Sequence, residues 1–403
     1  MQVKPEVGRV GRIDPVRGRV QYGRMRKRTG EEQWLPTRPA DGPPVTVGLN
    51  AVIVTVDREV PRVLTVDVGA RPSTATKARP AMPASNRGVD ADAADGKPPE
   101  RVPPESARAL PFGPLDPVGD VTLERALLRW VREQTGLELD WVEQLYTFGD
   151  QYRNPTEIEG GPRTVSVAYL VLVEAGRPIG AQGARWQDCY AFFPWEDWRA
   201  GRPALIDARI LPVLERWASA APGPDQARAR RERVDIVFGR GGMAWDGDRV
   251  LDRYELLYEV GLLAESHWDA WQRRGAGIEP RYPPWLEDDA GALGRPMAQD
   301  HRRILATALG RLRGKIRYRP VVFELLPPTF TLLELQRVVE SLAGLRLHKG
   351  NFRRLVEKGG LVEGTGHMAQ TGGRPAERFR FRREVLRERR APGVGLPGGR
   401  PLR

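Results

Sequence analysis

Apolar and polar residues are arranged in the manner of β-strands in several stretches of the first half of the chain. Residues 45–56 are rich in β-branched side chains, and 62–66 follows a Pro-containing turn, so the two stretches predict a β-hairpin. Residues 141–148 and 164–173 also read as strands, and the second is almost purely β-branched and apolar. The first half of the chain is therefore predicted to contribute the strands of a sheet.

Other stretches repeat their apolar residues at helical spacing. Segment 122–134 is predicted to be a helix with one apolar face, formed by Leu123, Ala126, Leu127, Trp130 and Val131. Residues 205–218 and 250–264 are also predicted to be amphipathic helices. Between them, the aromatic residues of 191–198 are expected to pack in a core: Phe192, Phe193, Trp195 and Trp198.

The last third of the chain carries the most informative pattern. Residues 331–342 predict an amphipathic helix that begins at a Thr331 cap with Glu334 three residues on, which is a capping box. A short turn at Gly344 follows, and then a second helix that ends at two glycines. This second helix is predicted to face a core with three apolar side chains, Phe352, Leu355 and Val356.

Two short predicted strands, 361–363 and 378–381, flank a glycine-rich tip at 366–373. Helices and a hairpin in this order from 301 to 383 predict a winged helix, a module whose exposed side chains suit phosphates and base edges. The candidate DNA-binding residues are Lys349, Asn351, Arg353 and Arg354 on the second helix and Arg374 at the tip.

These residues have different expected roles. Asn351 is the candidate for base readout, because asparagine can pair bidentately with adenine in the major groove; its alternative is a plain polar residue. Arg374 suits a flexible tip that enters a narrow minor groove. The alternative for Lys349, Arg353 and Arg354 is a solvated helix face, and the alternative for Arg374 is a solvated hairpin loop.

Charge is placed unevenly along the chain and supports the same interpretation. The 403 residues carry a formal net charge of +12. Residues 297–403 hold about 23 Lys and Arg against about 9 Asp and Glu, and residues 1–30 add about +7, so the remaining body is acidic. A basic end on an acidic body predicts a polyanion such as double-stranded DNA as the partner of that end.

Composition excludes several other classes of protein. The single cysteine, Cys189, rules out an internal disulfide and a cysteine-based zinc site, and the four histidines are scattered. No stretch approaches the apolar length of a membrane span, and the basic N-terminus lacks the apolar segment of a secretory signal. We therefore expect no membrane, no metal and a cytoplasmic location.

Residues 129–137 resemble the second half of the Nudix box of diphosphate hydrolases. Matches to that pattern fall on Arg129, Val131, Glu133, Gly136 and Leu137. Two positions where the pattern has Glu hold Trp130 and Gln134 instead, and the upstream Glu position falls on Val121, with Asp120 one residue out of step. The alternative is an ordinary helix with a chance resemblance.

These replacements predict that catalysis is lost. Nudix enzymes gather carboxylates on one helix face to hold divalent metal ions, and Mg²⁺ requires oxygen ligands in near-octahedral geometry. Tryptophan offers no oxygen and glutamine only a neutral carbonyl, so Glu133, even with help from Asp120, should hold metal weakly. We expect no catalytic residues and no cofactor.

Further stretches resemble the Nudix-related transcriptional regulators, the NrtR family. They include 143–150, 163–170, 300–308, 351–354 and 372–375, and the resemblance covers roughly 45–66, 108–218 and 297–383. It implies a Nudix-like α/β/α sandwich with a C-terminal winged helix-turn-helix. It also implies a dimeric repressor of NAD-metabolism or sugar-utilisation genes that senses ADP-ribose or a related metabolite. The chain looks like the longer, divergent members typical of alphaproteobacteria.

The predicted organisation has five parts. Residues 1–40 are expected to be a basic disordered arm, and 41–219 the Nudix-like sensing domain with a disordered insertion at 70–108. Residues 220–296 are expected to form a helical connector that begins with an Ala/Arg/Pro-rich stretch at 220–234. The winged helix is expected at 297–385 and a disordered tail at 386–403.

The candidate ligand-binding residues of the sensing domain are Arg129, Glu133, Arg153 and Arg163. Arginine matches the geometry of a pyrophosphate bidentately. Arg129 could instead be a salt-bridge residue, and Arg153 and Arg163 could simply lie on the surface. Two other functions stay open: an Mg²⁺-dependent ADP-ribose pyrophosphatase with a basic accessory domain, and a DNA-binding module whose body is only scaffold.

Overall fold

The computed structural model describes residues 12–13, 20–21, 45–67, 108–139, 141–150, 157, 161–177, 179–181, 183–275, 293–370 and 375–394. Two compact units are distinguished, Met1–Gly42 and Pro43–Arg403. In the first, β1 (Arg12–Ile13) pairs antiparallel with β2 (Val20–Gln21). These two strands lie within residues 1–40, and Arg108 lies within 70–108, two segments that were predicted to be disordered. All other positions of the two segments lie outside the described residues. No helix in the described part of the chain is long and apolar enough to cross a membrane.

The predicted hairpin is confirmed and forms the centre of a mixed sheet. β3 (Val45–Asp57) and β4 (Val60–Asp67) pair antiparallel, and β8 (Arg163–Leu172) runs parallel to β3 along its whole length. The strand order is β5-β4-β3-β8-β7, and β7 (Glu143–Phe148) is an edge strand. The short strands are β5 (Arg108–Ala109), β6 (Phe112–Pro114), which pairs with β3, and β9 (Arg185–Asp188), which pairs with β4.

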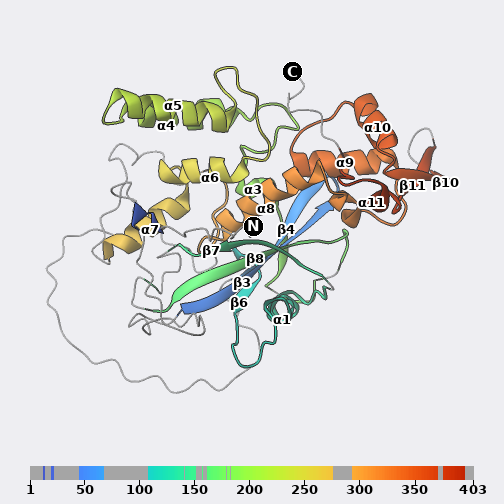
Figure 1. Cartoon of the computed structure of the whole chain (residues 1–403), viewed down its shortest axis with the longest axis horizontal. Coiled ribbons are helices and arrows are strands. Elements are labelled where there is room, and N and C mark those ends of the chain that lie inside the picture. The colour runs from blue at the N-terminus through green and yellow to red at the C-terminus, as the bar shows by residue number, and fades with distance from the viewer. Residues whose placement is uncertain are drawn as a thin grey trace, which may run out of the picture. The chain divides into compact units, whose positions relative to one another are not determined.

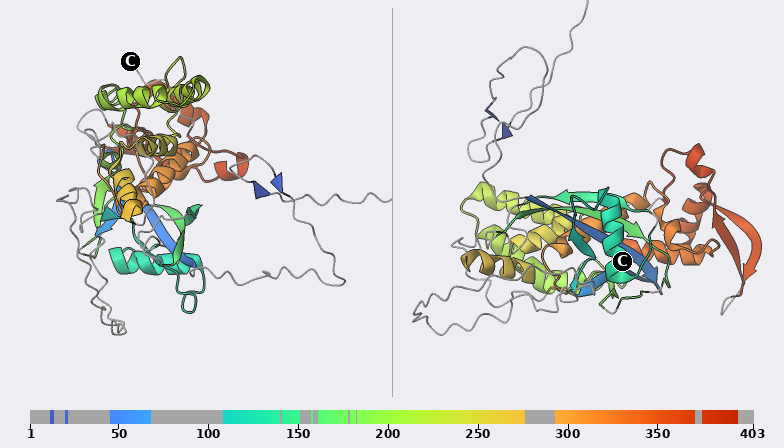
Figure 2. Two further views of the ribbon diagram at one scale, coloured as in Figure 1. Left: turned by 90° about the vertical axis from the view of Figure 1, so that its left-hand side faces the viewer. Right: turned by 90° about the horizontal axis from the view of Figure 1, so that it is seen from below.

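The sheet is covered by helices on both faces. Alternate residues of β3 point to opposite sides, so Leu49, Ala51 and Ile53 enter one buried cluster with α1 (Leu123–Thr135). Val52 and Val54 enter a second, larger cluster on the other face, together with side chains of the later helices apart from the one at Ala264–Gly275. Figures 1 and 2 show α1 on one side of the strands and α6 (Val250–Glu259) and α8 (His301–Ile316) on the other. The predicted α/β/α sandwich is confirmed.

The helices that follow the sheet differ in part from the sequence prediction. They are α3 (Cys189–Phe192), the π-helical turn η1 (Ile206–Ile210) that continues into α4 (Leu211–Ser219), α5 (Pro224–Phe238), α6 (Val250–Glu259) and α7 (Ala264–Gly275). The stretch 220–234, predicted only as an Ala/Arg/Pro-rich connector, instead forms most of α5. Its Pro224 stands in the first turn, where proline is tolerated because the first amides have no helical acceptor.

A second correction concerns the helix predicted over 250–264. It ends at Glu259, because Gly261 adopts a left-handed backbone with φ of 78° and starts a turn before α7. The aromatic segment behaves as predicted. Phe192, Phe193 and Trp195 are at most 1% exposed and pack in the larger core.

The last part of the chain is a winged helix, as predicted. It consists of α8 (His301–Ile316), the 3₁₀ helix η3 (Val321–Leu325), α9 (Leu332–Ala343), α10 (Lys349–Lys358), β10 (Val362–Ala369), β11 (Ala376–Phe381) and a short closing helix α11 (Val385–Glu388). β10 and β11 pair antiparallel as the wing, and Phe330 forms an isolated bridge to Phe379 of β11.

The helix-turn-helix forms for the reasons that its sequence suggests. The Thr331 side chain accepts from the Glu334 amide and the Glu334 carboxylate accepts from the Thr331 amide, so the capping box is present. Gly344 ends α9 with a φ of 68°. Of the apolar residues predicted to face the core, Phe352 and Val356 are buried, but Leu355 is 36% exposed because it lies on the outer side of α10.

The predicted boundaries of the winged helix shift in the structure. Residues 386–394 were predicted as part of a disordered tail, yet α11 extends to Glu388 and Val394 is buried in the main core. At the other end, α8 is docked in the body: the Leu110 amide donates to His301 Nδ1 at 2.9 Å, and the His301 ring meets Phe112 edge-on. The sandwich and the winged helix thus share one compact unit, Pro43–Arg403.

Candidate ligand and nucleic-acid sites

Helix α1 carries the positions that resemble the Nudix box. The Thr122 hydroxyl caps its N-terminus by accepting from the Arg125 amide, and Gly136 ends it in a left-handed conformation with φ of 73°. Its apolar face, with Ala126, Leu127 and Val131, is buried against the sheet. The side chains of Arg129, Trp130 and Gln134 lie away from that face and contact the segment 112–120, so the prediction that Trp130 shares the buried apolar face was wrong.

Arg129 is held by a carboxylate of the preceding loop. Its guanidinium donates to both oxygens of Asp120, at 3.2 and 2.8 Å, and lies 3.8 Å from Glu133 one turn along the helix. The hydrogen bonds from Arg129 and from the Asp116 backbone hold the pKa of Asp120 below its ordinary value. Arg129 thus has the salt-bridge role that the sequence left open, and its side chain keeps 32% exposure.

The two residues that replace the expected glutamates have structural contacts. The Trp130 indole covers Gly113, where a Cβ would come within 2.1 Å of the ring, and its Nε1 donates to the Pro114 carbonyl at 2.9 Å. The Gln134 carboxamide accepts from the Phe112 amide at 2.9 Å and donates to the Phe112 carbonyl at 2.6 Å. Both side chains therefore tie β6 to the helix.

This arrangement does not fit a divalent metal. A metal site of the Nudix kind needs several carboxylate oxygens on one helix face, whereas Gln134 and Trp130 are hydrogen-bonded to backbone and Glu133 faces Arg129. Among the described residues, no group of three or more His, Cys, Asp or Glu is placed to hold a metal ion. The residues present do not suit Mg²⁺-assisted hydrolysis.

Arg163 begins β8 at the same end of the sheet. It pairs with Val45, the first residue of β3. Three residues further along β3, Gly48 pairs with Pro114 of β6. Its guanidinium donates to the Gly149 carbonyl at 2.6 Å and is otherwise exposed. Arg153 lies outside the described residues. The structure therefore brings Arg129 and Glu133 together on α1 and places Arg163 beside the start of β3. The ligand-binding role of these residues stays a prediction.

Helix α10 presents its predicted DNA-binding residues to the outside. Phe352 and Val356 fix its inner face, and Lys349, Asn351, Arg353 and Arg354 are all exposed. Arg354 donates to the Asn351 carboxamide oxygen at 3.0 Å. Within the part of the chain that the structure describes, none of the three cations forms an ion pair. The geometry suits a helix whose charges meet an external polyanion.

The wing contributes a second exposed edge. β10 and β11 extend beyond the helices, as Figure 2 shows, and Met368 of β10 is 58% exposed. Arg380 of β11 is paired with Glu363 across the hairpin at 2.5 Å. Arg374, predicted at the tip, lies outside the described residues.

A buried charge cluster joins the sandwich to the winged helix, and the sequence analysis missed it. Glu196 is 1% exposed and pairs with Arg253 of α6 at 3.0 Å and with Arg313 of α8 at 2.6 Å. Arg313 Nε also donates to the Leu342 carbonyl of α9 at 3.0 Å. The only available signal was a glutamate between tryptophans, Trp195 and Trp198, in an apolar segment.

Burial and charge act in opposite directions on Glu196. Burial alone would raise the pKa of its carboxyl, but the guanidiniums of Arg253 and Arg313 outweigh burial and hold the pKa below its ordinary value. The Tyr190 hydroxyl completes the cluster by donating to the Ser341 carbonyl at 2.6 Å. The carbonyls at the end of α9, which an α-helix leaves without internal donors, are thus bound by the body.

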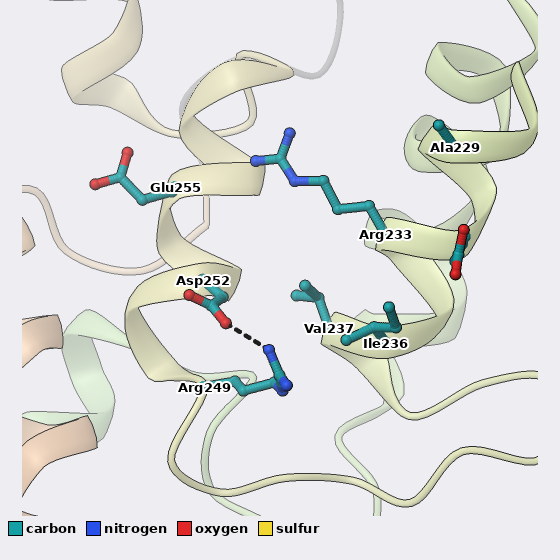
Figure 3. Close-up of a pocket in the computed structure, with 8 residues that line it drawn as sticks. Ala229, Arg233, Ile236, Val237, Arg249, Asp252 and Glu255 are labelled. Atoms are coloured by element: carbon teal, nitrogen blue, oxygen red, sulfur yellow. Dashed lines mark hydrogen bonds and ion pairs between the residues drawn. The ribbon is translucent and has the colours of Figure 1, made fainter. Parts of the chain in front are cut away.

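A hollow of about 370 Å³ lies between α5 and α6, away from any predicted site residue. Figure 3 shows Arg233 and Val237 of α5 facing Asp252 and Glu255 of α6, with Arg249 bonded to Asp252. Arg233 pairs with Glu259 at 2.6 Å. Its walls carry three carboxylates, Glu232, Asp252 and Glu255, against the two guanidiniums of Arg233 and Arg249, so this hollow offers no positive charge in excess to a nucleotide or to DNA.

The fold defines a two-part protein: an α/β/α sandwich whose helix α1 resembles the Nudix box, joined to a winged helix with an exposed basic helix. Comparison with known families agrees for the second part. Residues 322–381 match the family model of the NrtR DNA-binding winged helix domain.

A curated relative is similar over a shorter stretch. The "ADPR responsive transcriptional repressor NtrR" of Acinetobacter baylyi is 42% identical over 90 residues. The match spans 22% of this chain and 36% of the relative, about a third of its length.

Solved structures are similar over more of the chain at lower identity. Shewanella oneidensis NrtR, crystallised with a 27-mer DNA, matches at 19% identity and a TM-score of 0.43, over 85% of this chain and 95% of its own. A MutT/nudix family protein of Enterococcus faecalis matches at 14% identity and a TM-score of 0.42, over 87% of this chain and 90% of its own.

Proposed function

We propose that this protein is a DNA-binding transcriptional regulator, a repressor of NAD-metabolism genes, whose sandwich domain senses ADP-ribose or a related nucleotide. The observation that carries the proposal is the exposed basic face of α10 in a domain of the NrtR winged-helix family. Double-stranded operator DNA is the partner of this face. The relative from Acinetobacter baylyi is described as a repressor that responds to ADP-ribose, which supports the choice of effector.

The sandwich acts as a sensor and not as a hydrolase. Trp130 and Gln134 are bound to the backbone of β6, where a hydrolase needs carboxylates for metal. Arg163 lies at the surface beside the start of β3, and Glu133 lies at the surface of α1, with Arg129 held between Asp120 and Glu133. A nucleotide diphosphate bound there would meet arginines that match phosphate geometry, without the metal that cleavage requires.

Regulation follows from differential binding. The protein acts as a homodimer, so that two winged helices reach two half-sites of one operator. An effector shifts the equilibrium between a DNA-competent and a DNA-incompetent arrangement only if it binds the two with different affinity. ADP-ribose is proposed to favour the incompetent arrangement and release the DNA.

Genomic-fragment selection tests this function. Purified full-length protein is mixed with sheared genomic DNA from its source, and retained fragments are sequenced with and without ADP-ribose. We expect a small set of fragments upstream of NAD-metabolism genes, released when ADP-ribose is added. Retention that ignores ADP-ribose and every related nucleotide would instead identify a plain DNA-binding module, and failure to retain DNA would refute the proposal.

A further inference from the structure

The turn between β3 and β4 contacts the helix-turn-helix. β3 and β4 are joined by a two-residue turn, Arg58 and Glu59, and both have left-handed backbone, with φ of 48° and 64°. Such turns favour glycine or asparagine, because a larger side chain strains this conformation. A strained turn persists only where its surroundings hold it in place. Here the surroundings include α9, the first helix of the helix-turn-helix.

Glu59 contacts the winged helix through both its backbone and its side chain. The hydroxyl of Ser341, a buried residue of α9, can donate its one proton either to the Glu59 carbonyl at 2.8 Å or to the Arg337 carbonyl at 2.7 Å. Arg199 of the body donates to the same Glu59 oxygen. The Glu59 carboxylate pairs with Arg337 of α9 at 3.0 Å. It also pairs at 3.3 Å with Arg346, which lies in the turn between α9 and α10.

The opposite end of the same strand lies at the candidate effector site. β3 begins beside Arg163, and its fourth residue, Gly48, pairs with Pro114 of β6. The Pro114 carbonyl accepts the hydrogen bond from Trp130. A strand of 13 residues spans about 40 Å. β3 therefore runs without interruption from the candidate effector site to the helix-turn-helix.

We propose that the β3–β4 hairpin transmits effector binding to the DNA-binding helices, with Glu59 as the positioning residue that engages α9. This inference rests on the proposed sensor function. Only five residues, 344–348, separate α9 from α10, so a shift of the hairpin against α9 changes where α10 lies. Effector and DNA then influence each other's affinity reciprocally, and the coupling weakens when Glu59 no longer engages α9.

The partial exposure of these ion pairs suits a reversible contact. The side chains of Glu59, Arg337 and Arg346 are 33%, 49% and 48% exposed. Water can replace such pairs at little cost in free energy. The Glu196 cluster is the opposite case, since breaking it would leave charges buried without a partner. We therefore assign the moving contact to Glu59 and the fixed one to Glu196.

Glu59→Gln tests the inference, because it removes both ion pairs and keeps the shape of the side chain. The dissociation constant for a DNA fragment that the wild type retains is measured by fluorescence anisotropy with and without ADP-ribose. The readout is the ratio of the two constants, because the removal of a negative charge alters DNA affinity equally with and without ADP-ribose. We expect the ratio to fall about fivefold toward one, and Arg337→Gln should lower it similarly.

Asp57→Asn is the matched control. It makes the same charge change in the same hairpin, but the Asp57 carboxylate pairs at 3.4 Å with Arg62 of β4 and not with the winged helix. Its ratio should equal that of the wild type. A wild type indifferent to ADP-ribose would refute the sensor function and the transmission with it. A responsive wild type with an equally responsive Glu59→Gln, or an equal loss in Asp57→Asn, would overturn the hairpin inference alone.

Discussion

Helices α1 and α10 are both amphipathic, and they use their polar side chains in opposite ways. In α1, Arg129 is bound to Asp120, and Gln134 is bound to the backbone of Phe112. In α10, Lys349 and Arg353 project into solvent, and the described residues offer them no carboxylate. The polar side chains of α1 make their contacts inside the molecule, and the polar side chains of α10 remain available for a partner.

The contacts of Gln134 show how a polar side chain of α1 serves the structure. Glutamine supplies a donor and an acceptor together, which is what a backbone amide and carbonyl require. A carboxylate could satisfy the amide of Phe112 but would repel its carbonyl. Gln134 therefore makes a contact that fixes β6 on α1.

The largest effect on the free energy of unfolding is expected at the most deeply buried ion pairs. Glu196→Ala should lower the free energy of unfolding by about 3–5 kcal/mol, because Arg253 and Arg313 remain buried without their partner. Urea unfolding followed by tryptophan fluorescence measures this. Glu215→Ala, whose ion pair with Arg240 is exposed, should cost less than about 1 kcal/mol. Equal losses in the two variants would contradict the assignment.

The pH dependence of stability follows from the same cluster. Because the folded-state pKa of Glu196 lies below its ordinary value, its contribution is fully present above the ordinary glutamate pKa. It is lost as the pH falls through the lowered pKa. In Glu196→Gln this part of the acid destabilisation should be absent, which urea unfolding between neutral and acidic pH can measure. A variant with the same acid profile as the wild type would refute the charge assignment.

A smaller effect is expected at Gln134. Gln134→Ala removes two hydrogen bonds to Phe112 and should cost about 1–3 kcal/mol of unfolding free energy. Gln134→Glu should also destabilise, because the carboxylate faces the Phe112 carbonyl without a donor. Arg132→Ala, at an exposed position of the same helix, should stay within about 0.5 kcal/mol of the wild type. A stable Gln134→Glu variant would show that the structural contact is dispensable.

On α10 the expected effect is on specificity and not on stability. Asn351→Ala should relax discrimination at one base pair by about 1–3 kcal/mol. Competition between the selected fragment and single-base variants of it measures this. Equal losses on the selected and the scrambled sequence would assign Asn351 to the phosphate backbone.

The smallest effect is a change of salt dependence. Arg353→Ala or Arg354→Ala should weaken binding to most sequences and reduce the slope of log affinity against log salt by about 0.9 for each phosphate that is no longer neutralised. Arg125→Ala removes the same charge from an exposed position of α1 and should leave the slope unchanged. An unchanged slope in both α10 variants would count against a phosphate role for them.

Local signals predicted most of the fold. The capping box at Thr331 and the β-branched hairpin at 45–66 formed as expected, because each depends on neighbours in sequence. Helix α5 was not predicted as a separate helix within the helical connector, since it buries only a few apolar residues and its composition resembles that of a linker. Its stability comes from packing against α4 and α6, which the sequence does not show.

In the candidate sites, too, local features could be predicted from the sequence and tertiary contacts could not. The exposure of Lys349, Asn351 and Arg353 follows from helical periodicity and could be predicted. The contacts of Gln134 and Glu196 could not, because their partners are fixed by tertiary structure. Arg313 lies 117 residues from Glu196 in sequence, and no spacing rule joins them.

One reaction tests the contrast between the two helices most directly. Full-length protein bound to its selected DNA fragment is mixed with ADP-ribose and Mg²⁺, and the DNA-bound fraction and the amount of AMP are followed together. We predict that DNA is released while ADP-ribose stays intact. Accumulation of AMP with the DNA still bound would contradict this prediction, because α1 would then be a working hydrolase helix and α10 would not respond to it.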